Sequence, residues 1–571
     1  MVSQGRGRQR VRPRAARRAA QRASLKVGGR AERRGRSVPP TVAGFEAALH
    51  DRGHDGVAEA LISRHNQRME RMAEVGHTMQ CIGLPLLASY LPLALAAEEL
   101  GAHPGRAPIH SGPAWEDHLA WGLDSIAAAV RLMMSLQPVG ASIIARTQLE
   151  RWSSNLEFNS LIRQESGETT VAWLNRLWSA PVVWPDGVAT PVGDLFADVS
   201  ELLHGRGRLM PLVWLDIADV TDTPSSEHVR LLDTISDSLV VSLSHIRRCL
   251  ATVAEARGWG YRAQMVNMVR LVSPARSWVP DLRAFLFPLL PDHFRGVEGV
   301  LGATASEHRR VVSALRAGQR PDAPSELWPV LSFGAQRFRA LILAEHAQKM
   351  EREVRGDRFD EKGIQDLATE AVLAGEMAAM LALWLRQDPA KRSAADAFAV
   401  CASGLRSAQW LWLEDDDRGM GCLRCVIEQV ARARTWRLRP DRAVRIEASP
   451  KSTPRDWIEG AGWKRLNLLN RALGEFAHGS TRTNWNVARG ALVALQANAE
   501  ADEEAQYTGR THALAAMIFI VAVECAAWVD SFSSQLGEAY RKVVRVDDAR
   551  ADRAVDALMN RAWEKRGTPL R

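Results

Sequence analysis

The stretch HNQRMER at residues 65–71 returns as HAQKMER at residues 346–352, 281 residues further along the chain. Two more pairs follow in the same order at nearly the same spacing: an arginine and a glutamate four residues apart, then a Glu-x-x-His-Gly stretch. They are Arg146 and Glu150 with Arg424 and Glu428, and residues 201–205 with 475–479. Collinear matches whose spacing shrinks slowly are typical of a duplication followed by small deletions. The sequence therefore predicts two similar halves in tandem.

Hydrophobic periodicity predicts helices in both halves and no sheet. Only four tyrosines occur, and no series of short alternating segments marks strands. We therefore expect an all-α protein, a tandem duplication of a roughly six-helix bundle. A chain of 571 residues is too long for one hydrophobic core. The expected divisions are a basic disordered tail at 1–40, a first helical bundle at 41–258, a helical connector at 259–321, a second helical bundle at 322–540 and a C-terminal helix at 541–571.

Each bundle is expected to contain about six helices. In the first half they are predicted at 43–75, 79–99, 114–136, 140–165, 192–204 and 226–258. In the second half they are predicted at 334–354, 362–387, 394–413, 418–436, 462–478 and 506–536. The tryptophans on these helices, such as Trp152 and Trp410, are expected in the core, because large aromatic side chains at helical spacing usually pack there.

The basic character of the chain comes from its first 40 residues. They hold 13 arginines and lysines against the single acid Glu32, whereas the whole chain has a net charge of +8, so the remaining residues are slightly acidic. Such a flexible arm would bind RNA or DNA without sequence preference through the phosphates. The alternative is that these residues arise from a start codon placed too far upstream.

Six scattered cysteines and no secretory signal predict reduced thiols and a cytoplasmic location. Cys422 and Cys425 form the only close pair, and burial is expected to explain them better than a metal site. The apolar segments 81–97 and 513–528 resemble membrane spans, but prolines or Glu524 interrupt them, so no membrane partner is expected. The sequence predicts no metal and no cofactor, and leaves the oligomeric state open.

The Arg-x-x-x-Glu pairs are the first candidate site. Arg146 and Glu150, like Arg424 and Glu428, lie one helical turn apart on an otherwise apolar face. They could form simple ion pairs within the bundle. Alternatively, each arginine faces a cavity that holds an anion or a substrate, since burying an unpaired arginine is costly.

The Glu-x-x-His-Gly stretches are the second candidate site. Glu201 with His204, and Glu475 with His478, lie on one helical face just before a glycine expected to end the helix. The histidines could satisfy the carbonyl end of the helix. Alternatively, they act as general acids or bases beside Arg208 and Arg482. We expect the arginine and the histidine of each half to approach one another.

The stretch RALGEFAH at 471–478 resembles the Arg-x4-6-His motif of HEPN domains, helical bundles that often dimerise into metal-independent ribonucleases. The resemblance places the family's arginine and histidine at Arg471 and His478, with the tandem copy replacing the usual second subunit. It implies a ribonuclease or RNA-binding protein of a stress or defence system, with Glu475 orienting the histidine. The first half departs from the motif, because Ala197, Asp198 and Val199 stand where the arginine would be. The chain also resembles helical proteins of actinobacteria that carry these two motifs.

The alternative is a non-catalytic helical scaffold or ligand-binding protein. In that case the arginine, glutamate and histidine side chains only stabilise the two cores. The two hypotheses differ in whether His204 and His478 share a site between the halves or are buried separately within each half.

Overall fold

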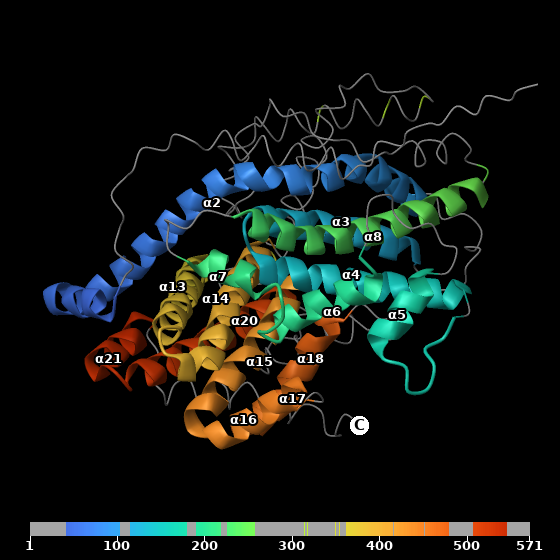
Figure 1. Ribbon diagram of the computed structural model, residues 1–571. Helices are drawn as coiled ribbons and strands as arrows, with labels where there is room; N and C mark the ends of the chain where they lie inside the picture. The colour runs from blue at the N-terminus through green and yellow to red at the C-terminus, as the bar shows by residue number, and fades with distance from the viewer. Residues whose placement is uncertain are drawn as a thin grey trace, which may run out of the picture.

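The computed structural model of this chain describes residues 41–102, 115–160, 162–179, 190–218, 225–256, 361–414, 416–449, 452–478 and 506–544, with single positions elsewhere. Within these ranges the regular elements are all helices and no strand occurs, which confirms the predicted all-α class (Figure 1). The tail at 1–40, nearly all of the connector at 259–321, the helix expected at 334–354 and the C-terminal helix expected within 541–571 lie largely or wholly outside the described residues.

Seven helices are described in the first half. They are α2 (Val42–Ala102), α3 (Trp115–Met134), α4 (Pro138–Ser160), α5 (Thr170–Ser179), α6 (Val192–Leu203), α7 (Met210–Ile217) and α8 (Ser226–Ala256). The expected helices at 43–75 and 79–99 are joined in the single element α2, whose one irregular point is Arg52–Gly53, where Gly53 has φ +64°. The expected break near residue 77 is therefore wrong, and the kink lies where a glycine takes the left-handed conformation.

The second half begins, within the described residues, at α13. Its helices are α13 (Glu361–Leu385), α14 (Arg392–Leu413), α15 (Arg418–Leu438), α16 (Pro440–Ala448), α17 (Pro454–Gly460), α18 (Asn467–Ala477), α20 (Gln506–Val529) and α21 (Ser534–Val543). The short helices α5, α7, α16, α17 and α21 have no counterpart among the expected helices. Helix α20 ends before the predicted residue 536, because Ser533 caps a separate helix by accepting a hydrogen bond from the backbone N–H of Leu536.

Within each half, the helices pack against one another in the same pattern. In the first half, α4 packs against α3, α6 and α8; in the second, α15 packs against α14, α18 and α20. Helix α2 lies against α3 and α8 as α13 lies against α14 and α20. This shared pattern supports the duplication, which stays an inference from the sequence.

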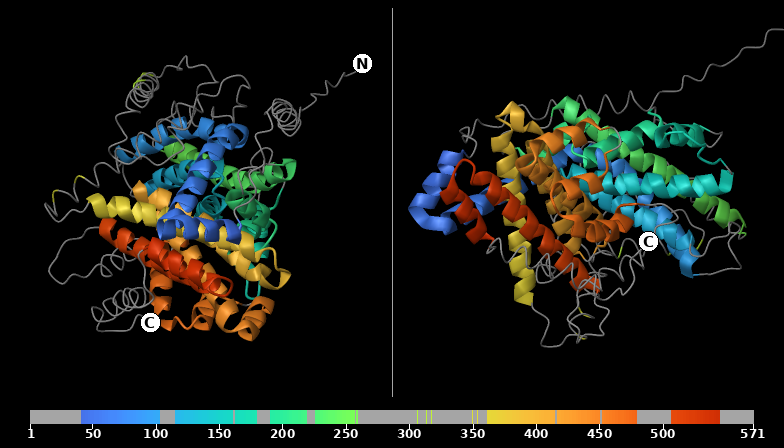
Figure 2. Two further views of the ribbon diagram at one scale, coloured as in Figure 1. Left: turned by 90° about the vertical axis from the view of Figure 1, so that its left-hand side faces the viewer. Right: turned by 90° about the horizontal axis from the view of Figure 1, so that it is seen from below.

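One hydrophobic core runs through both halves, so the expectation that a chain of this length needs more than one core is wrong for the described residues. It contains residues of both, for example Ile143 of α4 and Phe476 of α18. Trp152 and Trp412 belong to it, and Trp410 is buried as well, as expected for core aromatics. In Figure 1 helices α3, α4 and α8 of the first half lie above α15, α16 and α18 of the second half, and α21 lies beside α2. The two further views in Figure 2 show the same close stacking of the halves.

Buried ion pairs also join the halves. Arg64 on α2 pairs with Glu376 on α13 at 2.5 Å, and both side chains are almost completely buried. Arg131 on α3 pairs with Glu414, at the end of α14. Breaking the boundary between the halves would leave these charges buried without partners or expose them to water, which makes the halves energetically dependent on each other.

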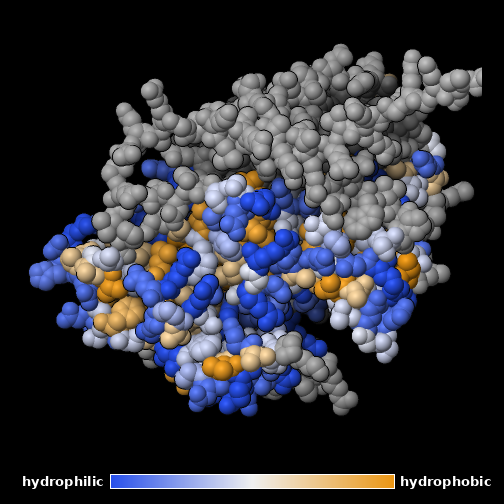
Figure 3. All heavy atoms as spheres, in the orientation of Figure 1, coloured by the Kyte–Doolittle hydropathy of each residue, from blue (hydrophilic) through white to orange (hydrophobic). Residues whose placement is uncertain are grey.

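One segment of α13, Asp366–Leu385, is long and apolar enough to cross a membrane by its composition. In this structure 67% of the most apolar 18-residue stretch of this segment is buried, and α13 packs against α14 and α20. The described surface in the view of Figure 3 mixes hydrophilic and hydrophobic residues.

Candidate functional site

Helices α4 and α15 carry the two Arg-x-x-x-Glu pairs. On α4 the Nη2 atom of Arg146 lies 3.1 Å from Oε1 of Glu150, an ion pair one turn apart. On α15 the charge of Glu428 acts on Arg424. The predicted ion pair is therefore present on α4. On α15 the corresponding arginine and glutamate interact electrostatically.

The histidines contact the glutamates of the opposite half. Nδ1 of His204, at the end of α6, lies 2.6 Å from Oε1 of Glu428 on α15. Nδ1 of His478, at the end of α18, lies 3.3 Å from Oε2 of Glu150 on α4. We expected each histidine to approach the arginine of its own half; the polar contacts instead cross the boundary between the halves.

Backbone contacts repeat this crossed arrangement. The residue after Arg146, Thr147, donates its hydroxyl to the carbonyl oxygen of Ala477 at 3.2 Å. The residue after Arg424, Cys425, donates its thiol to the carbonyl oxygen of Leu203, also at 3.2 Å. Ala477 and Leu203 each directly precede a histidine, so the two sets of contacts correspond position for position.

The two arginines, two glutamates and two histidines form one polar cluster. We call it the crossed cluster, and its members are Arg146, Glu150, His204, Arg424, Glu428 and His478. Arg146 acts electrostatically on Glu428 and on Arg424, and Glu150 acts on Arg424. The charges of the two arginines balance those of the two glutamates.

Burial and charge oppose one another at Glu428. Burial alone would raise the pKa of this carboxyl, but the charge and hydrogen bond of His204, followed by the charges of Arg424 and Arg146, lower it below its usual value. Burial lowers the pKa of Arg424, with Glu428 acting in the opposite direction. Glu428 is thus held ionised and can accept the Nδ1–H of His204.

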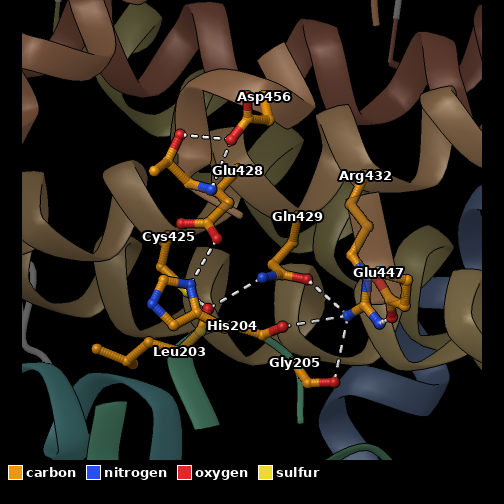
Figure 4. Close-up of polar contacts among 10 residues, drawn as sticks. Leu203, His204, Gly205, Cys425, Glu428, Gln429, Arg432, Glu447 and Asp456 are labelled. Carbon is orange, nitrogen blue, oxygen red and sulfur yellow. Dashed lines mark hydrogen bonds and ion pairs between the residues drawn. The ribbon is translucent and has the colours of Figure 1, made fainter. Parts of the chain in front are cut away.

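One face of α15 holds the end of α6 (Figure 4). Besides Cys425 and Glu428, Gln429 donates its side-chain Nε2–H to the carbonyl oxygen of Leu203 at 3.0 Å. Arg432 donates from Nη1 to the carbonyl oxygens of His204 and Gly205, each at 3.2 Å. Spaced three and four residues apart, these side chains lie on one helical face. Four contacts from one helix thus fix the backbone that presents His204.

Gly205 ends α6, as predicted. It has φ +67°, its N–H donates to the carbonyl oxygen of Leu202, and the N–H of Arg206 donates to that of Glu201. This is the Schellman arrangement, which favours glycine at this position. A Cβ atom on Gly205 would lie 2.5 Å from Nη1 of Arg432, so another residue here would also force the Arg432 side chain to move. The matching Gly479 lies outside the described residues.

Two of the remaining predicted site residues, Glu201 and Arg208, contact groups outside the crossed cluster. The carboxylate of Glu201 lies beside Gly207, and Arg208 pairs with Asp198 and donates to Thr234 at 3.2 Å. Arg471 is exposed on α18, two turns before His478, and Glu475 is partly buried there. Arg482 lies outside the described residues.

The cysteines and the described acidic residues do not suggest a metal centre. Cys422 and Cys425 are both buried, and burial raises the pKa of each thiol. Within the described ranges, no three side chains from histidine, cysteine, aspartate and glutamate gather in a way that could hold a metal ion.

Sequence reasoning missed Gln429, Arg432 and a cleft beside the end of α6. The cleft has a volume of about 1100 Å³, and Gly205 and Arg432 are part of its lining. The spacing of Gln429 and Arg432 from Glu428 was a usable signal, since helical positions three and four residues apart are neighbours. No local pattern marks the cleft, because its walls come from both halves.

Comparison with known proteins yields no relative: no protein-family model, no curated protein and no solved structure matches this chain.

Proposed function

We propose that this protein acts on RNA as a metal-independent ribonuclease of the HEPN type, with its two halves in place of two subunits. One observation carries the proposal. Two histidines from corresponding positions meet glutamates across the boundary between the halves, and both remain partly exposed, His204 at 29% and His478 at 38%. The family resemblance implies a site at the boundary between the two halves, because the second copy would replace the second subunit of the usual dimer.

The chemistry follows from the atom that each glutamate contacts. An imidazole that donates its Nδ1–H to a carboxylate keeps a lone pair on Nε2, which can accept a proton. In the proposed reaction Nε2 of His478 takes the proton of a ribose 2′-hydroxyl. The 2′-oxygen then bonds to the adjacent phosphorus, and the bond from phosphorus to the 5′-oxygen breaks, that oxygen taking a proton from water. Glu150 takes the orienting role that the resemblance assigns to Glu475.

Positive charge for the phosphate would come from Arg471. The resemblance assigns this role to Arg471, which is exposed on the helix that ends at His478. Its Cα atom lies seven residues before that of His478, roughly 10 Å along the helix axis, and a long arginine side chain can span part of that distance.

The second candidate is a non-catalytic scaffold. It is favoured by the first half, which has no arginine in the corresponding motif, and by the burial of Glu428, whose side chain is 4% exposed. In this function the crossed cluster only joins the two halves.

The deciding experiment is incubation of the purified protein with total RNA in EDTA. We expect the wild type to cleave RNA and His478→Ala to lose cleavage, with the matched control His50→Ala unaffected, since His50 is 90% exposed on α2. A wild type that cleaves no RNA contradicts the ribonuclease proposal and favours the scaffold.

Residues 1–40 are proposed to add non-specific affinity for nucleic acid. Thirteen basic side chains would release counterions from the phosphates, so this affinity should fall steeply with salt. We expect deletion of residues 1–40 to weaken retention on RNA at low salt and to leave the melting temperature unchanged. Equal retention by both forms would assign the affinity to the helical body instead.

A further inference from the structure

The cleft beside the end of α6 has walls from both halves. Its lining includes the loop after α6 and the start of α7 on one side, and the end of α13 and the start of α14 on another. Arg432 of α15 and Glu447 of α16 complete it. A volume of about 1100 Å³ is large enough for a ligand of nucleotide size.

Arginine dominates the charge of this cleft. Five arginines line it, and the only carboxylates in the lining are Asp396 and Glu447; the arginines are Arg206, Arg208, Arg386, Arg392 and Arg432. Arg208 and Arg432 are paired, with Asp198 and Glu447 respectively. Among the residues that the structure describes, Arg206, Arg386 and Arg392 form no ion pair within 4.0 Å of a carboxylate, although Asp396 interacts electrostatically with Arg386 and Arg392. The cleft therefore has an excess of positive charge.

The ring of Trp214 contacts two other side chains of the cleft, those of Arg386 and Asp396. The guanidinium of Arg386 lies over the ring of Trp214, 4.3 Å from its centre. The indole Nε1–H of Trp214 donates to Oδ1 of Asp396 at 3.1 Å. Because this contact restricts the side chain of Arg386, less freedom is lost when the guanidinium binds an anion.

The start of α14 contributes Arg392 and Ser393, its first two residues, to the lining of the cleft. The helix continues here from the turn Pro389–Lys391, and the backbone N–H of Arg392 donates to the carbonyl oxygen of Pro389. The positive charge at this wall therefore comes from the side chain of Arg392.

We propose that this cleft binds a small ligand that carries two or more phosphate groups. The planar guanidinium matches phosphate oxygens in a bidentate geometry. Arg206, Arg386 and Arg392 come from three different segments of the wall, so they can contact separate phosphate groups. A single phosphate would leave most of the volume empty. The proposal is independent of the histidine chemistry above, since neither His204 nor His478 lines the cleft.

The test is calorimetric titration of the full chain with inorganic pyrophosphate and with a nucleoside diphosphate, at low salt. We expect the wild type to bind both and the double variant R386A/R392A to bind at least about tenfold more weakly, since each lost charged hydrogen bond is worth that much. The matched control R163A/R455A removes two exposed arginines outside the cleft and should keep the wild-type affinity. Tighter binding of the nucleoside diphosphate would identify a nucleotide, and equal binding a bare polyphosphate group.

Arg206→Ala provides a second variant, because its exposed loop position keeps the helices intact. It should also weaken binding, without a change in melting temperature. The proposal is overturned if the wild type binds neither probe, or if R386A/R392A and the control bind equally. Binding of a short RNA without binding of either small probe would overturn it as well and move the site to nucleic acid.

Discussion

Glu428 and Glu150 occupy corresponding positions, but their surroundings differ. The side chain of Glu428 is 4% exposed and contacts His204 at 2.6 Å, whereas that of Glu150 is 16% exposed and contacts His478 at 3.3 Å. Removing a charge from a buried pair leaves its partner without compensation. The pair of Glu150 and His478 should therefore be less sensitive to substitution than the pair of Glu428 and His204.

We expect Glu428→Gln to lower the free energy of unfolding by about 3 kcal/mol, the usual cost of breaking a buried ion pair. Glu150→Gln, the matched change, should cost about 1 kcal/mol, since its pair is longer and more exposed. Urea unfolding at neutral pH measures both. Equal losses would contradict the difference in burial.

Glu376 predicts a dependence of stability on acid pH. Burial would raise its pKa, but Arg68, Arg64 and His65 outweigh burial and lower the pKa from 4.5 to about 2. A carboxyl whose pKa is lowered on folding stabilises the fold above its unfolded pKa, and this stability is lost as pH falls through the folded pKa. The window for Glu376 thus runs from about pH 4.5 down to about pH 2.

We expect Glu376→Gln to flatten the fall in stability across this window, relative to the wild type. Urea unfolding at several pH values measures the slope, and Glu46→Gln is the control because Glu46 is exposed. A variant that keeps the full wild-type slope would show that other carboxyls carry the acid sensitivity.

At the scale of the helices, close approach between α4 and α14 depends on glycine. A Cβ atom on Gly140 of α4 would lie 2.6 Å from both the Cβ and the Oγ atoms of Ser407 on α14. By contrast, a Cβ atom on Gly375 of α13 would meet nothing closer than a carbonyl oxygen at 4.0 Å. Both glycines are helical and buried, so they form a matched pair.

We expect Gly140→Ala to lower the free energy of unfolding by about 1 to 3 kcal/mol through overpacking. Gly375→Ala should instead raise it by up to about 1 kcal/mol, because alanine favours the helix and the space is open. Thermal and urea unfolding of the two variants test this. A neutral Gly140→Ala would mean that the two helices can separate without cost.

For the whole molecule, the two halves should unfold together. The hydrophobic core is continuous across both, and Arg64 with Glu376 and Arg131 with Glu414 cross the boundary. We expect one calorimetric transition for the described body, with equal calorimetric and van't Hoff enthalpies. Two separated transitions, one for each half, would contradict the shared core.

The sequence by itself determined the helical class, because hydrophobic periodicity is a local property that each helix shows on its own. It also determined the residues of the crossed cluster, since Arg146, Glu150 and their counterparts recur in order, and it located the end of α6 at Gly205, since a left-handed turn favours glycine. Only the tertiary structure decided that His204 meets Glu428 and that His478 meets Glu150. Those partners lie more than 200 residues apart, and no local pattern states which half each side chain faces. The arginine-lined cleft depends on the same packing. Arg206 and Arg392 line one cleft only when the halves stack, because the shared core and the buried ion pairs hold the two halves together.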